Sequence, residues 1–243
     1  MTTVFINASP KKKLGASEYL LKVQRLFVRA KKIKEKLMTK ADHSRILEKL
    51  KDADSVVFSL PLYVDGIPSH VLEFMEKMEL FCKEHGISLK VYAISNGGFI
   101  EGKQNKGVLD VFKNFCLRSG NEWGGGIGVG GGVMLHVMRL VLRLQIVLLL
   151  ARVLYNGIFN DDWLPTKAIN RFVVSVLVIL FFNLGVFLFM HLLGRAITKG
   201  RAVKNKYTRI MIPSFIFIPI AATFFFVFSV IKGGIFKGWL RKK

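Results

Sequence analysis

Residues 3–17 read TVFINASPKKKLGAS, a short apolar segment followed by a polar, cationic turn that contains glycine. The apolar segment 3–7 predicts a β-strand, and the periodic apolar residues after Ser17 predict a helix that begins where the turn ends. Backbone N–H groups at the start of a helix have no partner within it and carry the positive end of its dipole. We therefore expect a phosphate at this turn, with the hydroxyls of Ser9 and Ser17 as further donors.

Strand-like segments recur along the first half of the chain, and helical segments separate them. This alternation is typical of a parallel sheet covered by helices on both faces. The expected strands are 3–7, 54–60, 89–95 and 122–129, and the expected helices are 17–37, 42–51, 69–85 and 106–119. A doubly wound sheet usually has a second strand before residue 42, but the helical period of 17–37 leaves little room for it. We expect that strand either at 25–29 or to be reduced or absent.

The composition of the chain changes near residue 133. Residues 1–132 hold 21 Lys and Arg and 14 Asp and Glu, whereas residues 133–243 hold 16 and 2. The segments 172–193 and 210–231 each contain 22 residues without a formal charge, enough to cross a bilayer, which needs about 20. We expect an α/β domain at 1–145 and an α-helical membrane region at 146–243, with spans near 172–193 and 210–231 and a third span or an interfacial helix at 140–158.

The formal net charge of +21 favours a membrane partner over nucleic acid, because much of the excess flanks apolar segments, where Lys and Arg meet anionic headgroups. Residues 1–3 lead into the first strand without a signal-peptide pattern, so we expect a multi-pass protein of the cell membrane with its soluble domain in the cytoplasm. The segment 195–209 carries six basic residues and no acid. The positive-inside rule places this segment in the cytoplasm, on the same side as the domain, which requires that 140–158 is a third span. The basic tail of the chain would then lie outside the cell, unless the last apolar segment is re-entrant.

Two further loops follow expected strands in the same way as the first turn. Residues 61–68 (PLYVDGIP) form a loop that two prolines and a glycine make rigid and that presents the ring of Tyr63. Residues 95–99 (SNGGF) contain two glycines that let the backbone approach a flat ligand closely. Ligands of open parallel sheets bind beyond the carboxyl ends of the strands, so the three loops are expected to form one site.

The motifs NASPK at 7–11 and GAS at 15–17 resemble the phosphate loop of the NAD(P)H-dependent FMN reductase and quinone reductase branch of the flavodoxin-like superfamily. Pro61-x-Tyr63 with Ile67-Pro68 resembles the second flavin loop of that family, and Asn96-Gly97-Gly98 its third. The likeness covers about residues 3–145. It implies a flavodoxin-like doubly wound parallel sheet with noncovalently bound FMN. It also implies ten cofactor-binding residues: Ser9, Lys11, Ala16 and Ser17 around the phosphate, Pro61, Leu62 and Tyr63 against the isoalloxazine, and Asn96, Gly97 and Gly98 at its edge.

The resemblance implies an oxidoreductase that passes electrons from NADH or NADPH through FMN to a quinone or another acceptor. Together with the expected membrane spans, it leads us to expect a membrane-anchored enzyme whose acceptor is a quinone or a membrane redox partner. We expect no catalytic acid or base, because the cofactor supplies the reactive atoms. We also expect no metal, since Cys82 and Cys116 lack ligand spacing. The alternative is a non-catalytic flavodoxin-like binding or sensor domain tethered to the membrane. The expected partners are the lipid bilayer and the acceptor, with a homodimer as a further candidate and no nucleic acid.

Overall fold

The computed structural model describes residues 1–11 and 15–231. Within them, six parallel strands form one sheet in the order β2-β1-β3-β4-β5-β6. The first five strands follow the order 2-1-3-4-5 of flavodoxin-like doubly wound sheets. The expected parallel α/β class is therefore confirmed. The strands are β1 (Thr2–Asn7), β2 (Lys31–Lys36), β3 (Ser55–Pro61), β4 (Lys90–Asn96), β5 (Glu122–Gly130) and β6 (Lys206–Arg209).

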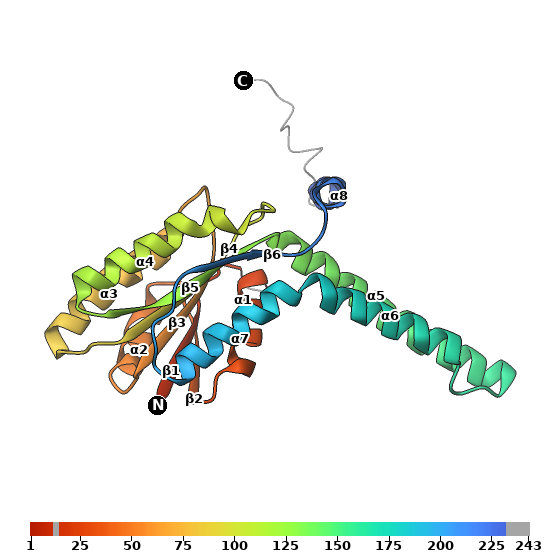
Figure 1. Cartoon of the computed structure of the whole chain (residues 1–243), viewed down its shortest axis with the longest axis horizontal. Helices are drawn as coiled ribbons and strands as arrows, with labels where there is room; N and C mark the ends of the chain where they lie inside the picture. The colour runs from red at the N-terminus through yellow and green to blue at the C-terminus, as the bar shows by residue number, and fades with distance from the viewer. Residues whose placement is uncertain (12–14, 232–243) are drawn as a thin grey trace, which may run out of the picture.

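Helices cover both faces of this sheet (Figure 1). Apolar residues of α2, α3 and α4 pack on one face, and those of α1, α7 and the first turns of α5 pack on the other. Each face thus has its own apolar core, as expected for strands buried on both sides. The helices are α1 (Ala16–Phe27), α2 (Ala41–Leu50), α3 (Ser69–His85), α4 (Lys106–Ser119), α5 (Gly132–Asn160), α6 (Thr166–Phe182), α7 (Leu184–Thr198) and α8 (Ser214–Ile231), with a short 3₁₀ helix, η1 (Gly102–Asn105), before α4.

The expectation of a reduced or absent second strand is wrong. β2 has six residues and pairs with β1 along its whole length. Its sequence, KKIKEK, lies at the edge of the sheet, where lysines discourage pairing with other chains. The carboxylate of Glu35 is buried and contacts Arg45 and Lys49 of α2. Such a strand has no apolar alternation to reveal it, and the helix expected at 17–37 ends at Phe27.

The expected span 172–193 is divided at Asn183 in the structure. α6 ends there, and α7 continues at a bend of 61°. α7 turns back over the sheet and packs closely against α1. The close approach is clear at Gly194, where a Cβ would lie only 2.6 Å from the Cβ of Phe27. The chain then adds β6 beside β5. Residues beyond 145 thus return to the sheet. A domain boundary at 145 would assign α7 and β6 to the membrane region, although both pack on the sheet.

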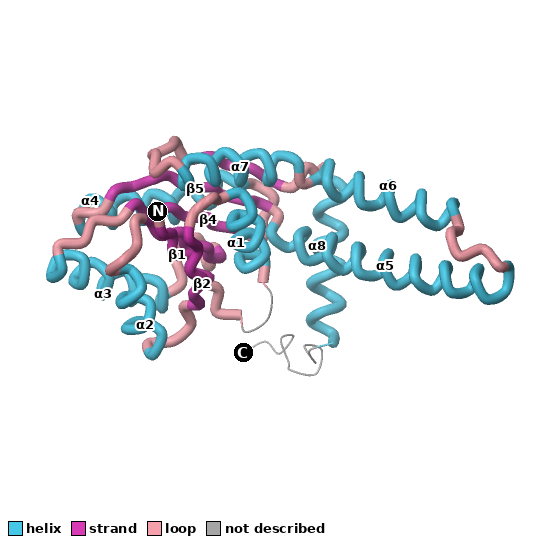
Figure 2. The backbone as a smooth tube through the Cα atoms, turned by 90° about the horizontal axis from the view of Figure 1, so that it is seen from below, coloured by secondary structure: helices cyan, strands magenta, loops and turns pink. Residues whose placement is uncertain are grey.

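α5 and α6 form a helical hairpin that extends away from the sheet (Figures 1 and 2). The first turns of α5 are buried, but beyond Leu140 the apolar side chains of both helices are largely exposed. α5 and α8 are each long and apolar enough to cross a membrane, and α6 with α7 adds a third candidate if the bent pair is counted as one span. The hairpin returns the chain to the sheet, so the basic segment 195–209 lies beside the sheet, and residues 206–209 of it form β6.

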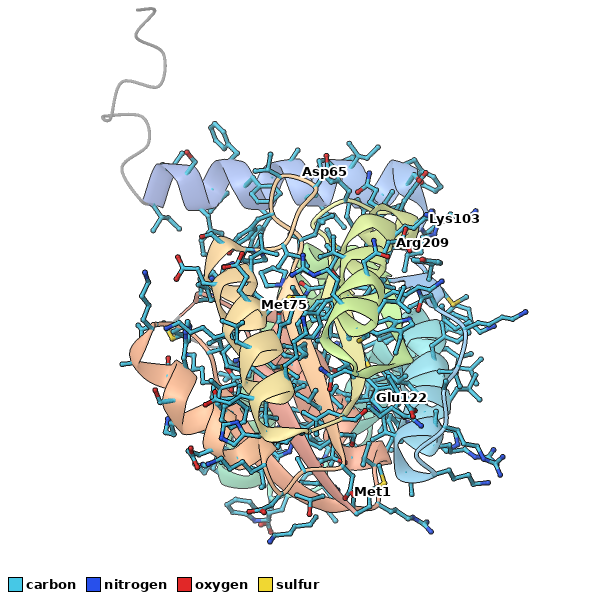
Figure 3. All side chains as sticks on the ribbon, turned by 90° about the vertical axis from the view of Figure 1, so that its left-hand side faces the viewer. Met1, Asp65, Met75, Lys103, Glu122 and Arg209 are labelled. Carbon is cyan, nitrogen blue, oxygen red and sulfur yellow. The ribbon has the colours of Figure 1, made fainter. Side chains whose placement is uncertain are left out.

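Both exposed apolar parts leave from the carboxyl edge of the sheet. α5 follows β5 directly, and α8 follows β6. Figure 3 shows α8 at the end of the domain that carries Asp65 and Arg209, with Met1 and Glu122 toward the opposite end. The carboxyl ends of the strands thus face the side of the molecule that carries its exposed apolar helices.

Candidate functional site

A cavity of about 190 Å³ lies at the carboxyl edge of the sheet, between the loops that follow β1, β3, β4 and β5. It sits beside the switch point of the topology, where β2 lies on one side of β1 and β3 on the other. All ten residues expected to bind a cofactor line it; that they do so stays a prediction. The cavity is lined by Ser9, Lys11, Gly15, Ala16, Ser17, Pro61, Leu62, Tyr63, Asn96, Gly97, Gly98, Gly132, Val133 and Phe225.

The loop after β1 brings donors to one end of the cavity. α1 begins at Ala16, and its N-cap, Gly15, has no side chain to accept a hydrogen bond. The N–H groups of Ala16 and Ser17 therefore have no partner within the helix. The backbone N–H of Lys11 donates to Ser9 Oγ at 3.4 Å, which holds the hydroxyl within the loop. Lys12 and Lys13, which belong to the same expected anion turn, lie outside the described residues.

Asn96 ties three of the loops together at the buried side of the cavity. Its Nδ2 donates to Ser17 Oγ at 2.8 Å and to the carbonyl of Leu60 at 3.0 Å. The hydroxyl of Ser59 also donates to the Ser17 carbonyl at 2.8 Å. These bonds fix the start of α1 against the ends of β3 and β4, so the Asn96 amide is already engaged by the protein itself.

The loop after β3 holds Tyr63 at the mouth of the cavity. Tyr63 and Gly66 exchange two backbone hydrogen bonds, at 3.1 and 2.9 Å, around a two-residue turn. Val64 and Asp65 in that turn have φ values of 45° and 56°, which are unfavourable for a β-branched residue such as Val64. The Tyr63 side chain remains 42% exposed. The turn thus holds an accessible aromatic ring on a strained backbone that two hydrogen bonds close.

Glycine backbone forms the side of the cavity near β4 and β5. The N–H of Gly132 donates to the carbonyl of Gly97 at 2.8 Å, and a Cβ on Gly132 would lie only 3.0 Å from that oxygen. Sequence reasoning missed Gly132 and Val133, although a glycine cluster directly after a strand was a usable signal. It also missed Phe225, for which no local signal exists, because Phe225 lies inside an unbroken apolar run.

The cavity favours an anion. Its lining residues include one cation, Lys11, and no carboxylate. Cys82 and Cys116 are buried elsewhere in the core, and burial raises the pKa of both thiols. Among the described residues, no group of three or more His, Cys, Asp or Glu is placed to hold a metal ion.

No family model matches the chain, and no curated protein matches it. Several solved structures are similar to it, over 51% to 82% of this chain. The Trp repressor binding protein of Bacillus subtilis is 17% identical with a TM-score of 0.44, covering 53% of this chain and 84% of that one. An NADPH-quinone reductase from P. pentosaceus is 13% identical with a TM-score of 0.45, covering 54% and 86%. An FMN-dependent NADH-azoreductase from Bacillus anthracis is 16% identical with a TM-score of 0.33, covering 51% and 85%.

The strand order and the position of the cavity define the class of the protein: a doubly wound α/β protein of flavodoxin-like topology. An apolar hairpin, α5 and α6, is inserted before the last strand of its sheet.

Proposed function

We propose that the protein is a membrane-anchored, FMN-dependent oxidoreductase that passes electrons from NADH or NADPH to a quinone or another membrane acceptor. The observation that carries the proposal is the cavity itself. Its lining includes all ten residues implied by the family resemblance, which come from three loops far apart in the sequence. In the overall reaction, NAD(P)H and one proton supply two electrons and two protons to the quinone, which becomes the quinol.

The lining residues fit the phosphate of a flavin nucleotide. The N–H groups of Ala16 and Ser17, which have no partner within α1, would hold it together with the hydroxyl of Ser9 and the ammonium group of Lys11. Tyr63 and the backbone of Gly97 and Gly98 would lie against the flat ring system. Bound FMN would supply the hydride-accepting chemistry, while the protein positions it and excludes water. The cavity is smaller than the ~300–1,000 Å³ usual for small-molecule sites, and Phe225 of α8 bounds it.

The exposed apolar helices support the membrane anchor. We assign α7 and β6 to the α/β domain, and α6, α8 and α5 beyond about Leu140 to the membrane region. The basic segment 195–209 lies on the domain side, which the positive-inside rule places in the cytoplasm. Anchoring in the bilayer raises the effective concentration of an acceptor dissolved there.

The protein purified in detergent should be yellow, and NADH or NADPH should bleach it. Ser9→Glu places a carboxylate where the phosphate would bind, so the flavin content should fall about tenfold or more. Ser44→Glu is the matched control, because Ser44 is exposed on α2, away from the cavity. Flavin content is measured by absorbance after removal of free FMN.

The outcomes separate the candidate functions. A Ser9→Glu protein that retains its flavin contradicts the placement of the phosphate. Flavin that NADH and NADPH do not bleach favours the sensor alternative. A colourless wild-type protein that does not take up added FMN contradicts both.

A further inference from the structure

We propose that α8 does not cross the membrane but lies in the plane of the leaflet nearest the domain, as a roof over the cavity, and that the site takes a lipid-dissolved acceptor that enters beneath α8 beside Phe225. The position of α8 does not depend on any cofactor. The choice of acceptor rests on the function proposed above.

One stripe of α8 residues is already packed on the domain. Phe217 is buried in the same apolar core as α1 and α7, and Ala221 packs against that core. The ring of Phe217 reaches Gly131, where a Cβ would lie 3.3 Å from it. Phe225 follows at the same spacing of four residues and lines the cavity. Residues four apart share one face of a helix, so this face of α8 is turned toward the carboxyl edge, buried at Phe217 and still 57% exposed at Phe225.

The direction of α8 fits a helix in the membrane plane. Figure 1 shows α8 end-on, whereas α5 and α6 run along the plane of that picture. Figure 2, turned by a quarter, shows α8 crossing the base of the hairpin. A hairpin that enters a bilayer along its own length therefore leaves α8 parallel to the membrane surface, at the level where the domain meets the lipid.

The charge of the chain beyond α8 argues independently against a crossing. Residues 232–243 carry five basic residues and no acid: Lys232, Lys237, Arg241, Lys242 and Lys243. A spanning α8 would move them to the side opposite the basic segment 195–209, which the positive-inside rule disfavours. An in-plane α8 keeps both basic segments on the domain side, where each meets anionic headgroups.

The outer surface of α8 identifies what covers it. Ser214–Ile231 contains no charged residue, and its outward side chains are exposed apolar ones, among them Phe215, Ile218 and Phe226. A charge-free helix is stable among acyl chains rather than in the headgroup layer. The roof of the cavity then lies in hydrocarbon, so a molecule that passes Phe225 comes from the bilayer. An isoprenoid quinone has the solubility that this entrance demands.

The side on which the chain ends tests the position of α8. A cysteine appended after Lys243 is labelled with a membrane-impermeant maleimide in vesicles of each orientation. Glu84→Cys, at an exposed position of α3, marks the side of the membrane on which the domain lies. Leu164→Cys, at the tip of the hairpin, marks the opposite side. The wild-type protein gives the background, since Cys82 and Cys116 are buried. Labelling together with Glu84→Cys supports an in-plane helix, and labelling together with Leu164→Cys overturns it.

A matched pair of variants tests the entrance. Phe225→Trp narrows the cavity mouth, whereas Phe226→Trp makes the same change on a residue that does not line it. In proteoliposomes that contain a long-chain isoprenoid quinone, kcat/KM for the quinone, expressed per bound flavin, should fall about tenfold or more in Phe225→Trp only. If both variants lower kcat/KM for the quinone equally, the proposed entrance beside Phe225 is wrong. A protein that lacks flavin overturns the proposed function instead, and the maleimide labelling still decides the position of α8.

Discussion

At the scale of single residues, His43 couples the stability of the fold to pH. Its ring is 2% exposed, its two nitrogens have no hydrogen-bond partner among the described residues, and it packs edge-on against Phe74. Burial lowers the pKa of the imidazole; Lys77 and Lys40 add to this effect, and Glu73 and Asp42 oppose it. Protonation therefore favours the unfolded chain.

The stability that His43 contributes is complete above its unfolded pKa of about 6.5 and is lost as the pH falls toward its lower folded pKa. The loss is at most about 1.4 kcal/mol per pH unit. His43→Leu should reduce the drop in melting temperature between pH 7.5 and pH 5.5, measured in detergent. Identical drops in the two proteins would show that His43 does not titrate with unfolding.

Ten residues of the cavity could be predicted because they lie in loops that follow strands whose apolar runs are visible in the sequence. Ser9, Tyr63 and Gly97 are local signals of this kind. Phe225 could not be predicted in the same way, since its neighbours in the chain predict only a membrane helix. What brings it to the cavity is the contact of Phe217 with Gly131, which depends on the whole fold.

At the scale of elements, α7 should behave as part of the α/β domain. Gly194→Leu would drive a side chain into Phe27 of α1, because a Cβ alone already lies 2.6 Å from it. Overpacking of this kind costs about 1–3 kcal/mol, so the denaturant midpoint should fall clearly. Leu192→Ala, on the more exposed face of the same helix, should change the free energy of unfolding by less than about 0.5 kcal/mol. An unchanged denaturant midpoint in Gly194→Leu would contradict the assignment of α7 to the domain.

Two elements escaped prediction for opposite physical reasons. β2 is an edge strand of lysines, and its only buried residue is the charged Glu35. α7 is apolar enough to be read as half of a span, and only the break at Asn183 and the distant partner α1 show otherwise. The central strands and α2, α3 and α4 were predicted because their apolar patterns are local.

At the scale of the whole molecule, the α/β domain is discontinuous in sequence. A chain ending at residue 145 would lack α7 and β6. Their loss would expose the apolar core under α7 and leave the edge of β5 unpaired, so we expect this fragment to aggregate. Replacing residues 142–177 with a short Gly-Ser linker joins the base of α5 to the end of α6, two helices that pack against each other, and should preserve the sheet. Circular dichroism and size-exclusion chromatography in detergent compare the two. A well-folded 1–145 fragment would contradict this assignment.

The position of β6 after the hairpin also sets an order of events during biosynthesis. A ribosome makes β1 to β5 first, then the hairpin of α5 and α6, and only afterwards α7 and the final strand, β6. The sheet therefore cannot be completed until the hairpin has been synthesised and has brought the chain back. Failed insertion would leave a nascent chain with an open strand edge, the kind of surface that chaperones and proteases recognise.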